Sequence, residues 1–169
     1  PKAFAQQMLA AGFSTNDLAP NNKALPALLA NGESIEKLLK SGYSCTQLAR
    51  AGADPNALLK QGCTVQSLVA GGVSLKALRE AGVSAAALKE AGVTAAELKA
   101  AGYSPKELVA AGFSAKDLKN AGLTAQQLSE AGLSADDLEQ AGFSKGDLLR
   151  AGVGAVSSCR LDRVKTLKA

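Results

Sequence analysis

The stretch Ala111-Gly-Phe-Ser-Ala-Lys-Asp-Leu-Lys-Asn120 decides the fold, because the two stretches that follow repeat its pattern. They are Ala121-Gly-Leu-Thr-Ala-Gln-Gln-Leu-Ser-Glu130 and Ala131-Gly-Leu-Ser-Ala-Asp-Asp-Leu-Glu-Gln140. The consensus is A-G-Φ-[S/T]-x-x-x-L-x-x, where Φ is apolar, and we number its positions 1 to 10. Fifteen copies fit between residues 11 and 160, with Gly at position 2 in 14 of them and Leu at position 8 in 14. Such self-similarity predicts a repeat architecture.

The chemistry of the repeat favours a short helix in each copy. Ser or Thr at position 4 suits a helix N-cap, and Asp, Glu or Gln at position 7 would complete a capping box. Gly at position 2 of the next copy suits the left-handed residue that ends a helix. We therefore predict an all-α solenoid of short two-turn helices, one per ten-residue repeat. The helices should run from position 5 to position 1 of the next copy, at 85–91, 95–101, 105–111, 115–121, 125–131 and 135–141.

A square β-helix is the alternative, because ten residues are two pentapeptides. In that fold each five-residue side points a small and a large residue inward, and Ala111 with Phe113 would satisfy one side. The other side would place position 6 inside, where Lys76, Lys106, Lys116 and Asp136 stand. Burying so many unpaired charges is prohibitive, which favours the helical interpretation.

The regularity of the repeat divides the chain into four parts. Residues 1–20 form an N-terminal segment with the first repeat, and residues 21–40 form degenerate repeats with Lys23 and Glu33 at the apolar position 3. Residues 41–152 form the regular solenoid. Residues 153–169 form an aberrant repeat that contains Cys159, and we expect it to continue beyond this stretch. Ser157 or Ser158 would cap a longer helix there, with Leu161, Val164 and Leu167 at a spacing of three.

The composition predicts no enzyme, cofactor or metal site. The chain has no His and no Trp, so the commonest general base and metal ligand are missing. The recurring acids at position 7 are explained by capping, and Tyr43 and Tyr103 occupy the apolar position 3 as core residues. The net charge of +4 comes largely from the last ten residues, and positive and negative residues are interspersed elsewhere. This pattern predicts no nucleic-acid binding. No apolar run approaches the roughly 20 residues that cross a bilayer.

The three cysteines leave two interpretations open. Cys45 lies at position 5 and Cys63 at position 3, and both positions belong to the predicted core. They are either packed thiols or a disulfide, and the disulfide requires an oxidising compartment. Because 18 residues are nearly two repeats, the pair would meet only if about two repeats complete one turn of the solenoid.

The decapeptide, together with Ser158-Cys-Arg-Leu-Asp-Arg-Val-Lys-Thr-Leu-Lys-Ala169, resembles the repeat region of the DotG/IcmE family of Dot/Icm type IVB secretion systems. The resemblance covers nearly all of residues 11–169. It implies a structural spacer or scaffold in the periplasm, anchored by segments outside this stretch, with other core proteins and further copies of itself as partners. It implies no catalytic residues. Cys159 would then pair outside this stretch or with another copy. A repeat-protein binding module, secreted or cytoplasmic, that recognises a protein partner is the alternative function.

Overall fold

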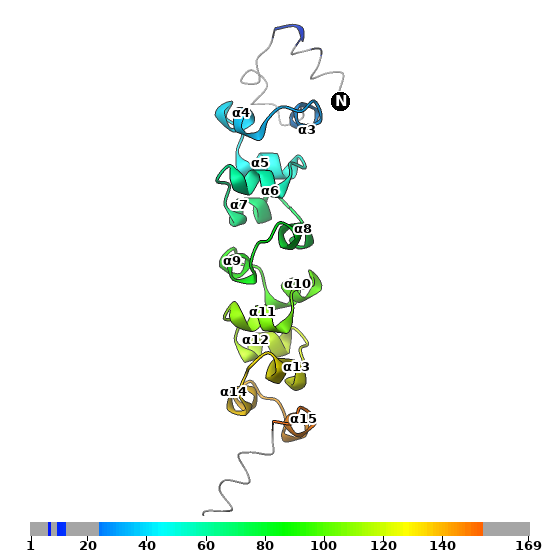
Figure 1. Ribbon diagram of the computed structural model, residues 1–169, viewed down its shortest axis with the longest axis vertical. Helices are drawn as coiled ribbons and strands as arrows, with labels where there is room; N and C mark the ends of the chain where they lie inside the picture. Colours follow the sequence, from blue (N-terminus) through cyan, green and yellow to red (C-terminus); the bar gives the residue numbers. More distant parts are fainter. Residues whose placement is uncertain (1–6, 8–9, 13–23, 154–169) are drawn as a thin grey trace, which may run out of the picture. The chain divides into compact units, whose positions relative to one another are not determined.

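Short α-helices at a ten-residue spacing build the described part of the chain, which is residues 7, 10–12 and 24–153 of a computed structural model (Figure 1). These residues contain no strand, and the prediction of an all-α repeat solenoid is confirmed. Each helix has six residues and ends at position 10, one residue earlier than predicted, because position 1 serves as the C-cap. The helices are α3 (Leu25–Ala30), α4 (Ile35–Lys40), α5 (Cys45–Arg50), α6 (Pro55–Lys60), α7 (Val65–Ala70), α8 (Leu75–Glu80), α9 (Ala85–Glu90), α10 (Ala95–Ala100), α11 (Pro105–Ala110), α12 (Ala115–Asn120), α13 (Ala125–Glu130), α14 (Ala135–Gln140) and α15 (Lys145–Arg150).

The chain forms two compact units, residues 1–83 and residues 84–169. Unit 1 contains α3 to α8, and unit 2 contains α9 to α15. In unit 2, each of α9 to α13 packs against the helix two further along the chain. In unit 1, α5 packs against both α6 and α7. Two repeats therefore complete one turn of the stack in each of these regions.

Position 4 caps the N-terminus of every described helix from α4 to α15. Its side-chain oxygen accepts a hydrogen bond from the backbone N–H of position 7, which would otherwise lack a partner within the helix. Complete capping boxes occur in α5, α10, α11, α13, α14 and α15. In α12 the box is incomplete, and the Ser114 hydroxyl donates to the Asp117 carboxylate at 2.6 Å instead.

The C-terminus of each helix closes in a Schellman motif, and α12 is representative. The backbone N–H of Gly122 donates to the carbonyl of Lys119 at 2.8 Å, and that of Leu123 donates to the carbonyl of Leu118 at 3.1 Å. Gly122 has φ of 75°, which a residue with a Cβ adopts only at a cost. The prediction that a glycine of positive φ ends each helix is confirmed for the described helices.

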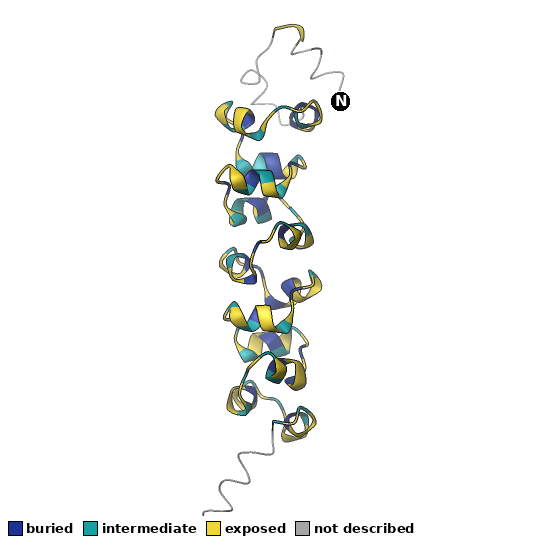
Figure 2. Cartoon of the chain, in the orientation of Figure 1, coloured by how far each residue is buried: buried dark blue, intermediate teal, exposed yellow. Residues whose placement is uncertain are grey.

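The core of the stack is a row of leucines at position 8. Leu38 to Leu128 at this position are all 0 % exposed, and Leu148 is 2 % exposed. Figure 2 shows the same division on each helix, with a buried face and an exposed face. Six residues are too few for a helix to be stable alone, because the cost of nucleation is not recovered. Stability must come from burying each leucine between neighbouring repeats, worth roughly 1.5–3 kcal/mol per side chain.

Position 6 faces solvent, as the helical interpretation requires. Lys76, Lys106, Lys116 and Asp136 are all exposed. The square β-helix would have pointed these side chains inward, so the alternative fold is excluded for the described residues.

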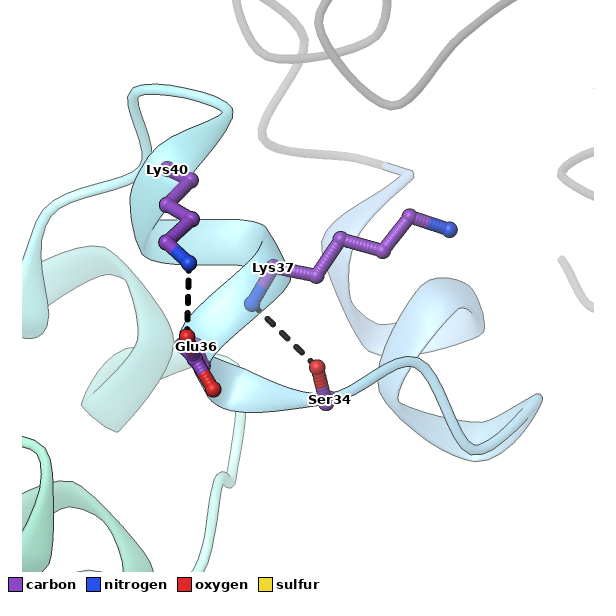
Figure 3. A network of polar contacts seen from close by, with 4 residues as sticks. All are labelled: Ser34, Glu36, Lys37 and Lys40. Atoms are coloured by element: carbon purple, nitrogen blue, oxygen red, sulfur yellow. Dashed lines mark hydrogen bonds and ion pairs between the residues drawn. The ribbon is translucent and has the colours of Figure 1, made fainter.

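The degenerate stretch 21–40 keeps the helical period in its described part. α3 has Pro26 in its first turn and lacks a side-chain cap, because its N-cap residue is Ala24. Glu33, at the apolar position 3, forms an ion pair with Lys37 at 2.8 Å. Figure 3 shows how α4 is held locally: Ser34 caps the backbone N–H of Lys37 at 3.2 Å, and Lys40 reaches Glu36 at 2.6 Å.

Some of the predictions concern residues outside the described part of the chain. The longer helix in 157–167 and the position of Cys159 belong to residues 154–169, and Lys23 lies just before the first described residue of α3's repeat. Within the described part of the chain, none of the helices has the length and apolar character that crossing a membrane requires.

Candidate functional site

The structure joins Cys45 and Cys63 in a disulfide within unit 1. Cys45 is the first residue of α5, and Cys63 lies in the turn between α6 and α7. Their Cα atoms are 5.6 Å apart, inside the range that a disulfide spans without backbone movement. Cys63 is buried, at 5 % exposed, and Cys45 is half-buried.

The pairing follows from the two-repeat turn. Position 5 of one repeat lies beside position 3 of the repeat two further on, and pairs of residues in unit 2 occupy the same register. Ala95 and Phe113 line one groove, and Ala125 and Phe143 line another. The 18-residue separation therefore brings Cys45 and Cys63 together, as it would any pair in this register.

Shallow grooves recur along unit 2. Each lies between the N-terminal turn of one helix and the flank of the helix two further on. The groove between α10 and α12 has a volume of about 470 Å³, and the equivalent groove between α13 and α15 about 450 Å³. The α10–α12 groove contains Val93, Ala95, Phe113 and Asp117, and the α13–α15 groove contains the corresponding Leu123, Ala125, Phe143 and Asp147.

Lysines at position 9 bridge successive turns of unit 2. The ammonium group of Lys89 donates to the carbonyl of Gly112 at 2.6 Å and lies 5.1 Å from the centre of the Phe113 ring. Lys119 makes the same two contacts, with the Gly142 carbonyl and with Phe143. Lys99 donates to the Gly122 carbonyl at 2.8 Å. Each positive charge thus lies at the negative end of a helix two repeats away, which stabilises the turn.

These bridges are the feature that sequence analysis missed. The signal was present, because position 9 is Arg or Lys in Arg79, Lys89, Lys99 and Lys119. The accepting carbonyl lies 23 residues after the lysine. The sequence indicates this contact only once it is known that two repeats complete a turn.

The recurring carboxylates serve as caps. The hydroxyl of Thr94, and then its backbone N–H, hold the pKa of Glu97 below its ordinary value by hydrogen bonding to the ionised form. The Ser134 hydroxyl and backbone N–H lower the pKa of Asp137 in the same way, and those of Ser144 lower that of Asp147. A carboxylate held in its ionised form stabilises the helix start as an acceptor and is poorly suited to donate a proton at neutral pH.

Tyr43 and Tyr103 are buried, as predicted for the apolar position 3. Tyr43 is 2 % exposed and Tyr103 5 % exposed, so both are core residues. Burial raises the pKa of the Tyr43 hydroxyl. Among the described residues, no group of three or more His, Cys, Asp or Glu is placed to hold a metal ion.

Comparison with known proteins identifies the repeat itself. A family described as a decapeptide repeat region matches residues 42–111 and, in an overlapping second match, residues 82–155. No curated protein and no solved structure matches the chain. The two family matches together span residues 42–155, which include the helices α5 to α15. The chain therefore belongs to the decapeptide repeat family.

Proposed function

We propose that this chain is a structural spacer or scaffold segment in the periplasm, within the core complex of a type IVB secretion system. The decapeptide repeat and the resemblance of residues 158–169 to the DotG/IcmE repeat region support the proposal. Its partners are other core proteins of the apparatus and further copies of itself. It binds no nucleic acid, cofactor or metal and catalyses no reaction, and segments outside this stretch provide its membrane anchor.

The observation that carries the proposal is the uniformity of the contact between turns. In unit 2 the same positions meet at each turn, with a buried leucine, a glycine stop and, in three repeats, a lysine bridge of the same register. A stack of this kind gains length one repeat at a time without a new kind of interface. That property suits a spacer, in which the number of repeats sets a distance.

A protein-binding module is the second candidate, and the row of grooves in unit 2 favours it. Each groove combines apolar side chains with a carboxylate, as in the groove formed by Val93, Phe113 and Asp117. In a binding module the identity of these groove residues matters, whereas in a spacer only the number and register of repeats matter.

An exchange of repeats separates the two functions in the intact protein in its own bacterium. Residues 111–130 are deleted in one variant and replaced by a second copy of residues 91–110 in another. A spacer requires that the deletion lowers secretion of effector proteins and that the replacement restores it, because length is recovered with different side chains. Secretion that stays lost in the replacement, while the protein accumulates normally, supports the binding module and overturns the spacer.

The location is tested with a single exposed cysteine. Lys116 is exposed and is replaced by Cys in a Cys159→Ser background, and cells with a permeabilised outer membrane are treated with a membrane-impermeant maleimide. Labelling of Lys116→Cys without lysis is the result expected of a periplasmic segment. Labelling that requires lysis of the inner membrane overturns the periplasmic location.

A further inference from the structure

The helices α5 and α7 lie in close contact. These two helices make the most extensive contact of any pair of described helices. Gly71, at position 1, lies against Ala49 of α5, and a Cβ built on Gly71 would come within 2.5 Å of the Ala49 Cβ and 3.0 Å of the Thr46 carbonyl oxygen. Real Cβ atoms essentially never approach closer than 3.0 Å. Gly71 therefore permits a spacing that alanine, the consensus residue at position 1, would prevent.

The equivalent turns of unit 2 cannot adopt this spacing. There the corresponding position 9 and position 1 residues are pairs such as Lys89 with Ala111 and Lys99 with Ala121, and both members carry a Cβ. Because two such Cβ atoms must stay apart, these pairs cannot approach each other as closely as Gly71 approaches Ala49. The close turn is also the one that carries the Cys45–Cys63 disulfide.

We propose that the Cys45–Cys63 disulfide is a redox-controlled clamp that closes the α5–α7 turn, and that Gly71 is the residue that admits the closed form. Oxidation draws the two helices together, and reduction lets the turn relax to the ordinary spacing. The three components lie within 27 residues of unit 1, between positions 45 and 71 of the chain. Unit 2 has no equivalent of the clamp among its described residues, so it serves as the internal reference.

The chemistry of release is thiol–disulfide exchange with a dithiol. A thiolate of the dithiol attacks the sulfur of Cys45, because Cys45 is the more exposed of the two residues. Cys63 then leaves as a thiolate and takes up a proton. The second thiolate of the dithiol then attacks the dithiol sulfur that is bonded to Cys45. This closes the disulfide of the dithiol and releases Cys45 as a thiolate, which takes up a proton. Two electrons and two protons pass to the protein, and the dithiol becomes a disulfide.

Hydrogen exchange of the whole chain, oxidised and reduced with dithiothreitol, tests the clamp. Releasing a loop of 18 residues is expected to speed exchange of the amides in 45–73 roughly 100-fold, while amides in 95–141 stay unchanged. Equal acceleration in both regions, or none in 45–73, overturns the proposal. So does the presence of three free thiols in protein kept under oxidising conditions.

The clamp predicts that Gly71→Ala changes the melting temperature in opposite directions in the oxidised and the reduced protein. In the oxidised protein the added Cβ collides with Ala49, and the melting temperature should fall by about 5 °C. In the reduced protein, and in a Cys45→Ala/Cys63→Val variant, the turn is relaxed. The backbone of Gly71 has a right-handed conformation in the structure, with φ of −75°, which alanine also adopts without strain. Without the collision, alanine should therefore raise the melting temperature by restricting the unfolded chain.

Ala121→Gly is the matched control at the same position of unit 2. It should lower the melting temperature by the same amount in oxidised and reduced protein, because no disulfide governs that turn. If Gly71→Ala also behaves alike in the two redox states, the glycine and the disulfide act independently and the clamp is refuted.

Discussion

At the scale of single residues, positions 8, 4 and 6 of the decapeptide contribute to stability in different ways. Leu118 is fully buried, Ser114 accepts the Asp117 N–H at 3.1 Å, and Lys116 is exposed. Neighbouring residues of one short helix thus differ sharply in what they contribute to stability. The difference can be measured without altering the rest of the stack.

We predict that Leu118→Ala lowers the free energy of unfolding by about 2–5 kcal/mol, because it leaves a cavity between turns. Ser114→Ala should cost about 1 kcal/mol through the lost cap. Lys116→Ala should be nearly neutral. Urea unfolding followed by circular dichroism measures all three, and a Lys116→Ala cost as large as that of Leu118→Ala would contradict the helical frame.

The capping carboxylates predict how stability depends on pH. Their pKa values in the folded protein are lowered by hydrogen bonds at the helix start, as in Glu97, Asp137 and Asp147. Their contribution is therefore complete above the unfolded-state pKa of about 4, and it is lost as the pH falls through the folded-state values. The melting temperature should decline below about pH 4.

Asp137→Asn should make that decline shallower, because asparagine does not titrate. Asp136→Asn, one residue earlier on the same helix, is the control, since Asp136 does not cap it. Melting curves recorded from neutral to acid pH compare the two variants. Equal slopes for both would show that the cap at Asp137 does not cause the acid sensitivity.

At the scale of the element, a six-residue helix depends on the helix two repeats away. Lys119 of α12 reaches the Gly142 carbonyl just after the end of α14, and its ammonium group lies over the Phe143 ring at 5.1 Å. The contact combines a charge at a helix C-terminus with a cation–π interaction. It links turns that are more than 20 residues apart in the chain.

We predict that Lys119→Gln destabilises unit 2 by roughly 0.5–1 kcal/mol, and that added salt reduces the difference. Lys116→Gln, three residues earlier and exposed, should have no such effect. Thermal unfolding at low and high ionic strength measures both variants. A Lys119→Gln effect that persists at high salt would assign the contribution to packing of the aliphatic chain.

At the scale of the whole molecule, stability should be set by the number of stacked repeats and by their register. Deleting residues 111–130 removes one turn and joins Ala110 to Ala131, which leaves the decapeptide pattern intact. We expect the shortened chain to remain helical and to unfold at a moderately lower denaturant concentration. Deleting residues 111–115 instead breaks the frame and should cause a far larger loss, which circular dichroism during urea unfolding will detect.

The sequence by itself determined the helices, because their signals are local. The cap at Ser114 and the glycine at 122 act within a single helix and its two ends, and the leucine at 118 marks the face of that helix that is buried. The decapeptide pattern alone is therefore enough to place each of them. The predicted helices were one residue too long at the C-terminus, because the sequence does not distinguish the C-cap from the last helical residue.

Only the tertiary structure decided how repeats meet, because the decapeptide does not encode the number of repeats in a turn. The stacking of every second helix brings Cys45 to Cys63, Lys89 to Gly112 and Gly71 to Ala49. The sequence left the cysteines as thiols or a disulfide and gave no reason for a glycine at position 71. Contacts between residues 18 to 23 apart depend on the pitch of the stack, and side-chain packing between repeats sets that pitch.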